Sequence, residues 1–449
     1  MLGTMPDQII VAALEGKSSQ YRADKMALYE ALYEGGDKFE SMKETFLPKR
    51  PIEKSANTQI GGGEHYKSRL SSAYYTNYAG GLIDWFTAKI VENNPRIVVD
   101  GSASEEAKEY WEGLNEDADG LGNPLITLCR WAARDVIINA RSYFGVDFQS
   151  EGDQDGKICL NTAIAIDDWD QDAHGTLIWV RRHTSETMRD EAEPWKCPTV
   201  ECHYWTFYDA EKVVVYKAEK LIAEKQFPKN AVATKEKEMY HDFGLPVFDI
   251  RADQSMWIMD RIKEPILKLF RREASLNWYL DSLCYQMPVF NLQTPSKYQS
   301  IPVTPLGAVV LEIGESASFL KPDAAGFEPN FKAVEQCKQS FYESLQVLAK
   351  EASSIPQAGR LSGDAIAGMQ KPMEILIDSF SWPIRNALMR LIEQLKKYRN
   401  EEDLEIELEG FGGVEVDDMP TEEEMNGRTE TAERPSTSEP APDSQLAEE

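Results

Sequence analysis

Apolar residues recur every three or four positions in two segments of the N-terminal half, which predicts two amphipathic helices. The first is expected to run from about residue 64 to 91 and to end at an Asn-Asn-Pro sequence. The second is expected at 124–140, with Asn123 as its cap and Pro124 as its first helical residue. Residues 1–63 combine short helical patterns with a polar stretch ending in three glycines, so this segment is expected to be partly flexible.

Between about residues 143 and 250 the pattern changes to short apolar or alternating runs, such as YFGVDF and KVVVYKAE. Turn sequences such as DQDG and DAHG separate these runs. Alternation with a period of two, bounded by turn residues, is typical of strands. This region is therefore expected to be mainly β.

The second half of the chain predicts a matched pair of helices at 265–286 and 329–350. At ~1.5 Å per residue each would be roughly 33 Å long. The residues between them, 287–328, are rich in proline and β-branched side chains, which predicts a small unit of strands and loops.

A third helical pattern is expected at 362–399, after a loop of small residues at 351–361. Pro372 and Pro383 lie inside this pattern and are expected to kink the helix or to divide it into shorter segments. The loop contains one arginine and neither histidine nor cysteine, so nothing in it indicates catalysis.

Composition changes this picture mainly at the C-terminus. The chain has 449 residues and a net charge of −28, and residues 401–449 hold 18 acidic and 2 basic side chains. Residues 400–449 are therefore expected to form a disordered acidic tail. The remaining acidity argues against a sequence-specific DNA-binding module, whose basic patches supply much of its affinity. No apolar run reaches the ~18 residues needed to span a bilayer, so no membrane association is expected.

Three sequences that suggest chemistry fail on inspection. GGGEHYKS (61–68) lacks the glycine that a phosphate loop needs before Lys-Ser. Asp168, Asp170 and Asp172 have calcium-loop spacing, but the glycine and glutamate of that motif are missing. Cys197, Cys202 and His203 lack the fourth ligand of a structural zinc site. We therefore expect no catalytic residues, no metal and no cofactor; a metal-dependent hydrolase using the three aspartates remains the enzymatic alternative.

The order of elements resembles the portal, or head–tail connector, proteins of tailed bacteriophages. Four sequences carry the resemblance: the helical pattern HYKSRLSSAYYTNYAGGLIDWFTAKIVENNPRI; the turn and helix of NEDADGLGNPLITLCRWAARDVIINARSYFGVDF; the succession of long helix, strand-containing insert and long helix; and SSIPQAGRLSGDAIAGMQKPMEIL. The resemblance covers most of residues 64–400. Only the acidic tail follows, which leaves no room for the helical crown of larger portals.

The resemblance implies an α+β fold with named parts. Residues 64–264 would form a mixed α/β wing, 265–286 and 329–350 a two-helix stem, and 287–328 a small clip with strands. Residues 351–361 would form a tunnel loop, and 362–399 a long kinked helix that joins stem to wing.

The resemblance also implies a function and partners. The protein would form a ring, most often of twelve copies, at the head–tail vertex of the virion, after assembly in the host cytoplasm. Double-stranded DNA would pass through its channel without sequence specificity during packaging and ejection. Terminase, capsid and scaffold proteins, and a head-completion adaptor would bind to it. A virion or scaffold protein that assembles without a channel is a further alternative.

Several basic or polar residues are candidates for contact with DNA on this reading. Gln357 and Arg360 lie in the expected tunnel loop, although Arg360 pairing with a carboxylate of a neighbouring copy is an equal alternative. Four basic residues near the start of the first stem helix would face the channel or the capsid, or would lie on a solvated helix face: Lys263, Lys268, Arg271 and Arg272.

Overall fold

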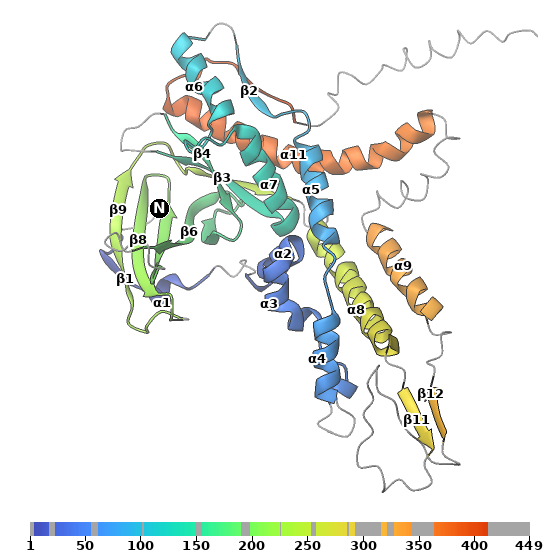
Figure 1. Cartoon of the computed structure of the whole chain (residues 1–449). Helices are drawn as coiled ribbons and strands as arrows, with labels where there is room; N and C mark the ends of the chain where they lie inside the picture. Colours follow the sequence, from blue (N-terminus) through green and yellow to red (C-terminus); the bar gives the residue numbers. More distant parts are fainter. Residues whose placement is uncertain are drawn as a thin grey trace, which may run out of the picture.

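The computed structural model shows an α+β protein, which confirms the predicted fold class (Figure 1). It describes residues 4–17, 23–54, 62–100, 103–148, 155–189, 198–224, 226–252, 257–284, 287–291, 316–320, 327–343 and 363–411. The predicted tunnel loop, 351–361, and residues 412–449 therefore lie outside the described residues.

An antiparallel six-stranded sheet forms the body on the left of Figure 1, with the strand order β1-β9-β8-β7-β6-β5. The strands are β1 (Gln8–Ile10), β5 (Ile166–Gln171), β6 (Leu177–Met188), β7 (Val200–Tyr208), β8 (Lys212–Leu221) and β9 (Val232–Tyr240). Alternate side chains of β8, such as Val214 and Tyr216, are buried beneath the short helix α1 (Val11–Leu14). The sequence analysis missed β1, which adds residues near the N-terminus to this sheet through its pairing with β9.

A smaller sheet of three antiparallel strands, β10-β3-β4, packs against α7. These elements are β3 (Arg141–Asp147), β4 (Lys157–Thr162), β10 (Val247–Arg251) and α7 (Leu125–Asn139). Pro124 is the N-cap of α7, so the helix begins one residue later than predicted. At the other end Ala140 has a φ of 59°, a left-handed conformation that ends the helix and turns the chain into β3.

The single helix predicted at 64–91 is two helices, α4 (Gly62–Ser72) and α5 (Tyr78–Ile90). Asn77 is the reason for the break. Its side-chain oxygen accepts a hydrogen bond from the backbone N–H of Gly80 at 2.8 Å, and its amide nitrogen donates to the backbone oxygen of Tyr33 at 2.8 Å. Asn77 thus caps α5 and ties it to α2 (Ala23–Glu34), which the apolar periodicity across the break does not reveal.

Residues 23–54 of the predicted flexible N-terminal segment form α2, α3 (Gly36–Phe46) and a 3-10 turn, η1 (Ile52–Lys54). Their large apolar side chains are buried in the main core. Phe39 stacks on Tyr75 with ring centroids 4.0 Å apart and meets Phe270 edge-on at 5.0 Å. The N-terminal helices therefore contribute to the core that holds the second half of the chain.

A long helix, α8 (Ile258–Cys284), leaves this core and runs beside α4 to a hairpin of β11 (Met287–Asn291) and β12 (Ser316–Leu320); α9 (Phe327–Glu343) returns alongside α8 (Figure 1). We call α8, this hairpin and α9 the arm. The predicted start of the first helix at Pro265 is wrong, because α8 begins seven residues earlier and Pro265 lies inside it. Buried Ile258 and Ile262 hold the additional turns in the core.

The third predicted helix is α11 (Gly363–Tyr398), which the two prolines do not divide into shorter helices. Its second half lies across α5, α7 and β10. The chain then continues into β13 (Ile406–Glu409), which pairs with β2 (Arg96–Val99) beside α6 (Glu105–Glu116). The prediction of disorder from residue 400 is therefore wrong up to residue 411, because Ile406 and Leu408 are buried on one face of β13.

Candidate functional site

The residues predicted to contact DNA fall into three groups. Gln357 and Arg360 lie outside the described residues. Lys263 belongs to the junction of α8 with α2: its ammonium lies 3.3 Å from Asp260 and 3.4 Å from the hydroxyl of Tyr29. These contacts place Lys263 at the junction of the arm with the N-terminal helices.

The other three residues, Lys268, Arg271 and Arg272, line one cavity of about 380 Å³ between α8, α4 and the segment that follows α3. We call this cavity the basic cleft. It is lined by Leu47, Pro48, Lys49, Arg50, Arg69, Lys268, Arg271, Arg272 and Ser275. Six of these nine side chains are cationic and none is a carboxylate.

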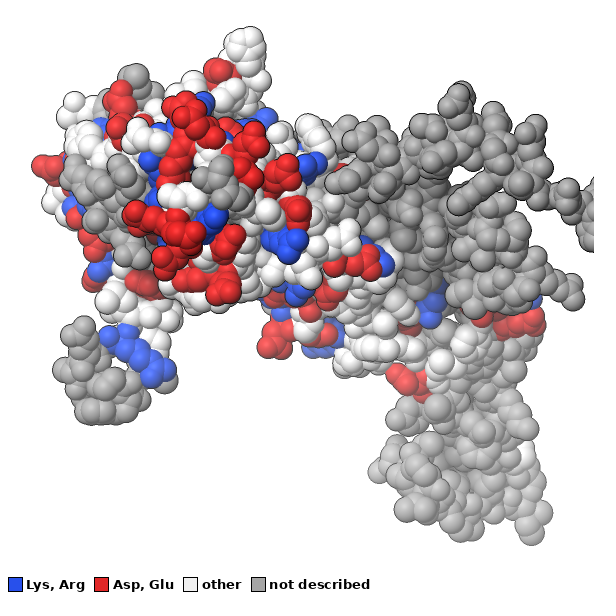
Figure 2. Space-filling model, turned by 90° about the horizontal axis from the view of Figure 1, so that it is seen from above, with Lys and Arg blue, Asp and Glu red and all other residues white. Residues whose placement is uncertain are grey.

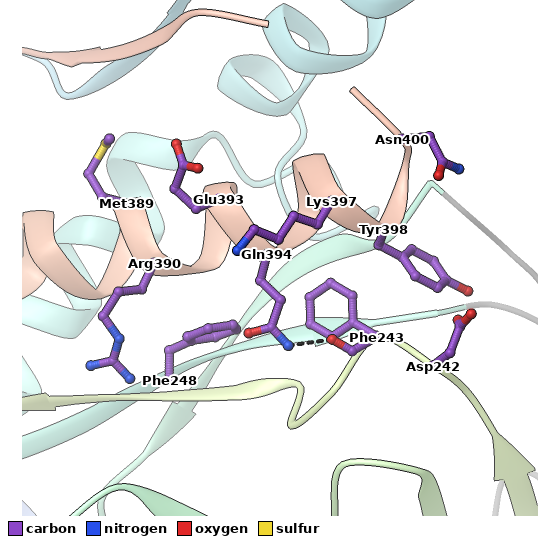
Figure 3. A pocket seen from close by; sticks show the side chains of 10 residues that line it. All are labelled: Asp242, Phe243, Phe248, Met389, Arg390, Glu393, Gln394, Lys397, Tyr398 and Asn400. Atoms are coloured by element: carbon purple, nitrogen blue, oxygen red, sulfur yellow. Dashed lines mark hydrogen bonds between the residues drawn. The ribbon is translucent and has the colours of Figure 1, made fainter. Parts of the chain in front are cut away.

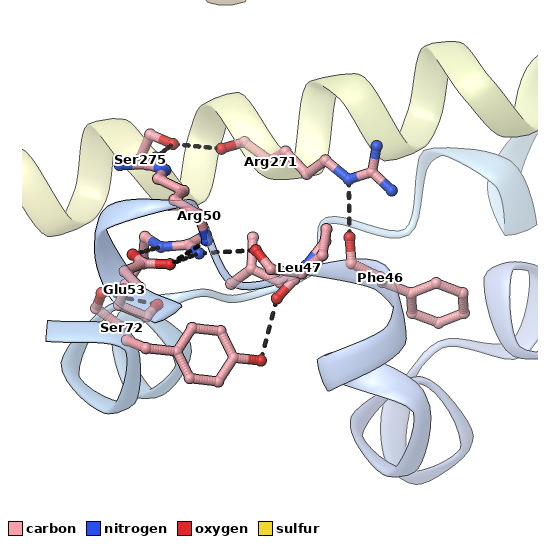
Figure 4. Close-up of polar contacts among 10 residues, drawn as sticks. Phe46, Leu47, Arg50, Glu53, Ser72, Arg271 and Ser275 are labelled. Carbon is pink, nitrogen blue, oxygen red and sulfur yellow. Dashed lines mark hydrogen bonds and ion pairs between the residues drawn. The ribbon is translucent and has the colours of Figure 1, made fainter. Parts of the chain in front are cut away.

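A buried ion pair fixes one wall of the basic cleft (Figure 4). Arg69 on α4 donates from Nε and Nη2 to the two carboxylate oxygens of Glu53, both at 2.7 Å. The same arginine donates to the backbone oxygen of Pro48 at 3.1 Å, and the backbone N–H of Arg50 donates to Glu53 at 2.7 Å. These bonds hold α4, η1 and residues 48–50 together as a unit.

Two further arginines join this unit to α8 through neutral groups. Arg271 Nε donates to the backbone oxygen of Phe46 at 2.9 Å, and Arg50 donates to the hydroxyl of Ser275 at 2.5 Å. Burial, and then the positive charges of Arg69 and Arg272, lower the pKa of Arg50. The lowered pKa of Arg50 therefore reflects burial first and the neighbouring positive charges second.

Lys268 and Arg272 are exposed and form no ion pair with any other described residue. They also line a second cavity of about 350 Å³ on the side of α8 that faces α9, with Ala333, Gln336, Cys337, Gln339 and Ser340. The two cavities therefore share these two cations. Such an arrangement suits an anionic ligand that carries several carboxylates or phosphates.

The three aspartates of the failed calcium motif lie in a β-hairpin. Asp168 and Asp170 are on β5, and Asp172 accepts hydrogen bonds from the backbone N–H groups of His174 and Thr176 in the turn to β6, both at 2.8 Å. Asp168 lies 3.5 Å from the guanidinium of Arg181. Among the residues that the structure describes, no three acidic, histidine or cysteine side chains are grouped to hold a metal ion.

Two of the three zinc candidates, Cys202 and His203, lie on β7 of the six-stranded sheet. Cys202 is buried, and Cys197 lies outside the described residues. His203 Nδ1 lies 3.0 Å from Nε2 of His183, whose ring stacks on Trp205 at 4.8 Å. Burial, together with the charge of His203, lowers the pKa of His183 to about 4, so this pair is neutral near pH 7.

A larger cavity of about 920 Å³ lies beneath α11 (Figure 3). Gln394 crosses it and donates to the backbone oxygen of Phe243. Arg390 and Lys397 are balanced there by Asp242 and Glu393, so this hollow has no excess of charge. It is less selective for one ligand chemistry than the basic cleft.

The charge of the molecule is thus unevenly distributed. Figure 2 shows acidic side chains gathered on the face that is seen from above, on the side where α6 lies in Figure 1. The first turn of α6 alone carries Glu105 and Glu106. The basic cleft is the local exception in a chain with a net charge of −28.

Sequence reasoning missed Lys49, Arg50 and Arg69 as members of this site. The basic pair in LPKRP (47–51) was visible, and its flanking prolines indicate a fixed turn. What the sequence did not show is that this turn packs against α8, more than 200 positions later.

None of the helices described is long and apolar enough to cross a bilayer.

Comparisons with known proteins identify no family. No family model matches the chain, and no curated protein matches it. Among solved structures, the chain is similar to one from the neck of an empty gene transfer agent particle computed with C6 symmetry: TM-score 0.39, 11% identity, 90% of this chain and 92% of that chain.

Two further chains are similar to a comparable degree. One comes from the virion of a native gene transfer agent particle, with a TM-score of 0.38, 11% identity, and coverage of 93% of this chain and 97% of that chain. The other comes from the neck of the native particle computed with C12 symmetry, with a TM-score of 0.38, 10% identity, and coverage of 74% and 81%. At these values the likeness carries no argument about function.

Proposed function

We propose that this protein is the portal subunit of a phage-like particle, and that copies of it form a ring through which double-stranded DNA is packaged and ejected. The arm is the observation that carries the proposal. A helix of 27 residues, a two-stranded hairpin and a returning helix project from a mixed α/β body, and a helix of 36 residues follows. This is the element order from which the portal resemblance was inferred.

The parts of the subunit follow from this proposal. Residues 64–264 form the wing, α8 from Pro265 onward and α9 form the stem, and 287–328 form the clip that meets the terminase and later the head-completion adaptor. Residues 351–361, with Gln357 and Arg360, form the tunnel loop, and α11 joins the stem to the wing. Capsid and scaffold proteins surround the ring, most often of twelve copies, at the head–tail vertex of the virion.

Exposed apolar side chains on the arm side support assembly into a ring. Tyr74, between α4 and α5, is 62% exposed, Phe331 on α9 is 48% exposed, and Trp382 on α11 is 66% exposed. Apolar surface that a single chain leaves in water is stabilised by burial against a neighbouring copy. We expect these residues to be covered in the ring.

Native mass measurement and negative-stain images of the purified chain test the proposal. The expected result is a closed ring with a central hole. Replacing Phe331 and Trp382 by serine is expected to reduce ring formation at least tenfold, whereas the control Leu221→Ser, a residue 51% exposed on β8, leaves it unchanged. A monomer or dimer at all concentrations, with no ring in particles, would contradict the proposal.

Packaging tests the role of the tunnel loop separately. Replacing residues 355–360 by a short Gly-Ser linker is expected to leave rings intact while DNA packaging or retention falls. Unchanged packaging by such rings would remove the loop from the mechanism and leave the ring itself untouched.

A further inference from the structure

The basic cleft has more positive charge than the described residues around it balance. Six cationic side chains line it, and Glu53 neutralises Arg69, which leaves five in excess. Lys268 and Arg272 are exposed, and they line both this cleft and the neighbouring cavity that faces α9. Like charges held this close repel one another, so binding of an anion stabilises this part of the fold.

The shape of the site favours a flexible acidic chain over a nucleic-acid duplex. Each cavity measures only about 350–380 Å³ and is recessed between α8 and a neighbouring element. A DNA duplex is stiff over about 50 nm, so it can touch the exposed side chains of Lys268 and Arg272 but cannot enter both recesses.

An acidic chain of suitable length belongs to the protein itself. Residues 412–449 contain 12 acidic and 2 basic side chains, a net charge of −10. They follow Phe411, which packs against the main core beyond β13. At ~3.3–3.6 Å per residue, 38 residues span up to roughly 130 Å when extended, so length does not limit their access to the arm.

We propose that the acidic segment 412–449 docks in the basic cleft, with its carboxylates on Lys268 and Arg272, and shields this face of α8 from nucleic acid. The inference goes beyond the proposed function because it concerns a contact within the protein. It predicts that the positive face of the arm becomes available only when the segment is displaced. If the protein is a monomer whose acidic segment docks in the basic cleft, this inference stands and the portal proposal fails.

Carbodiimide crosslinking of the full-length protein, followed by mass spectrometry, tests the docking. The reagent joins carboxylates to lysine amines without a spacer, so it reports direct ion pairs. Crosslinks from residues 412–449 to Lys268 or Lys49 are expected to exceed those to Lys229 and Lys237 at least tenfold. The two control lysines are exposed and lie away from the arm, on or beside the six-stranded sheet.

Salt and charge reversal complete the docking test. Raising the salt to 0.5 M is expected to reduce the crosslinks to Lys49 and Lys268, because the contact is electrostatic. Arg272→Glu is expected to reduce them at least fivefold. An even distribution over exposed lysines, or no crosslink from the tail at the cleft, would overturn the inference.

Binding of a fluorescent 20-base-pair duplex tests the shielding. A full-length variant in which the six acidic residues of 415–424 become amides is expected to bind the duplex at least tenfold more tightly than the native chain. Adding Lys268→Glu and Arg272→Glu to the amidated variant should abolish its gain in duplex affinity. Adding the matched control pair, Lys229→Glu and Lys237→Glu, should leave that gain in place. Equal binding by native and amidated chains would overturn the shielding. Tight binding by the native chain that the cleft pair alone abolishes would assign the cleft to nucleic acid.

Discussion

Replacing Glu53 by glutamine is expected to release α4 from η1 and residues 48–50, because it leaves the buried guanidinium of Arg69 without a counter-ion. The two side chains are only 3% and 5% exposed and share two contacts of 2.7 Å. Removing one partner of such a pair costs roughly 3–5 kcal/mol. Glutamine still accepts one hydrogen bond, so we expect about 3 kcal/mol, the lower end of that range.

Hydrogen exchange measured by mass spectrometry reports this loss locally. A loss of about 3 kcal/mol corresponds to roughly 150-fold faster exchange of the protected amides of α4, if they exchange through local opening. Peptides from α7 serve as the internal control, because that helix lies outside the basic cleft. They are expected to exchange at the native rate.

A double variant decides whether unmatched charge is the cause. Glu53→Leu with Arg69→Met removes both charged groups, and replacing a buried pair by apolar groups of similar volume is often neutral. We expect exchange in α4 to return most of the way to the native rate. Two results would refute the reasoning. One is an α4 exchange rate in the single variant within threefold of the native rate; the other is α4 exchange as fast in the double variant as in the single one.

The pH dependence of the pair follows from the pKa of Glu53. Burial by itself raises this pKa, but hydrogen bonds from the side chain of Arg69 and the backbone of Arg50 outweigh it and lower the pKa below its ordinary value. The folded state therefore binds the proton less readily than the unfolded chain. The stabilisation is present at neutral pH and is lost as the pH falls below about 4.3 toward the lowered pKa.

Three further predictions concern the body of the molecule. Trp111→Phe removes the hydrogen bond of 2.8 Å from the buried indole to Glu401. We expect the free energy of unfolding, measured by thermal denaturation, to fall by about 1–3 kcal/mol. An unchanged melting temperature would show that β13 is held by other contacts. The pKa of His183, lowered to about 4, means that the unfolded chain takes up its proton first as the pH falls. The stability of the native protein should therefore decline as the pH falls from about 6.5 to 4. Thermal melts of the native protein and of His183→Gln across this range should show a smaller decline in the variant. Gly80→Ala places a Cβ 2.9 Å from a backbone oxygen, so we expect the free energy of unfolding to fall by about 1–3 kcal/mol. The control Gly81→Ala meets nothing within 4 Å and should be neutral or slightly stabilising. Equal denaturation midpoints for the two variants would contradict this expectation.

The strongly periodic parts of the sequence predicted helices near their observed places, but their ends depended on tertiary contacts. Pro265 is a sound local signal for a helix start, yet Ile258 and Ile262 bury themselves in the core and extend α8 before it. Asn77 breaks the predicted helix at 64–91 because its side chain binds both α5 and α2. The bond of Asn77 to α2 and the burial of Ile258 and Ile262 both depend on residues that are distant in the sequence.

The basic cleft was only partly predictable from the sequence, because it too is formed by tertiary contacts. Lys268, Arg271 and Arg272 stand close together in the sequence, so a basic face on that helix was visible. Lys49 and Arg50 reach the same cleft only because α3 and η1 pack beside α8. The strand β13 was missed since its alternating IELE sequence lies within an acidic run, and only its pairing with β2 identifies it.

The pairing of β2 with β13 also has a consequence for the timing of synthesis. Residues 96–99 meet 406–409, so the two strands are about 310 residues apart in the chain. At 5–20 residues per second the ribosome needs roughly 15–60 s to make the second strand after the first. Until then β2 has no partner in its sheet, and α6 lacks the bond from Trp111 to Glu401. Residues 406–409 therefore determine when this sheet is complete, and a nascent copy that lacks them would present an unfinished surface to its neighbours.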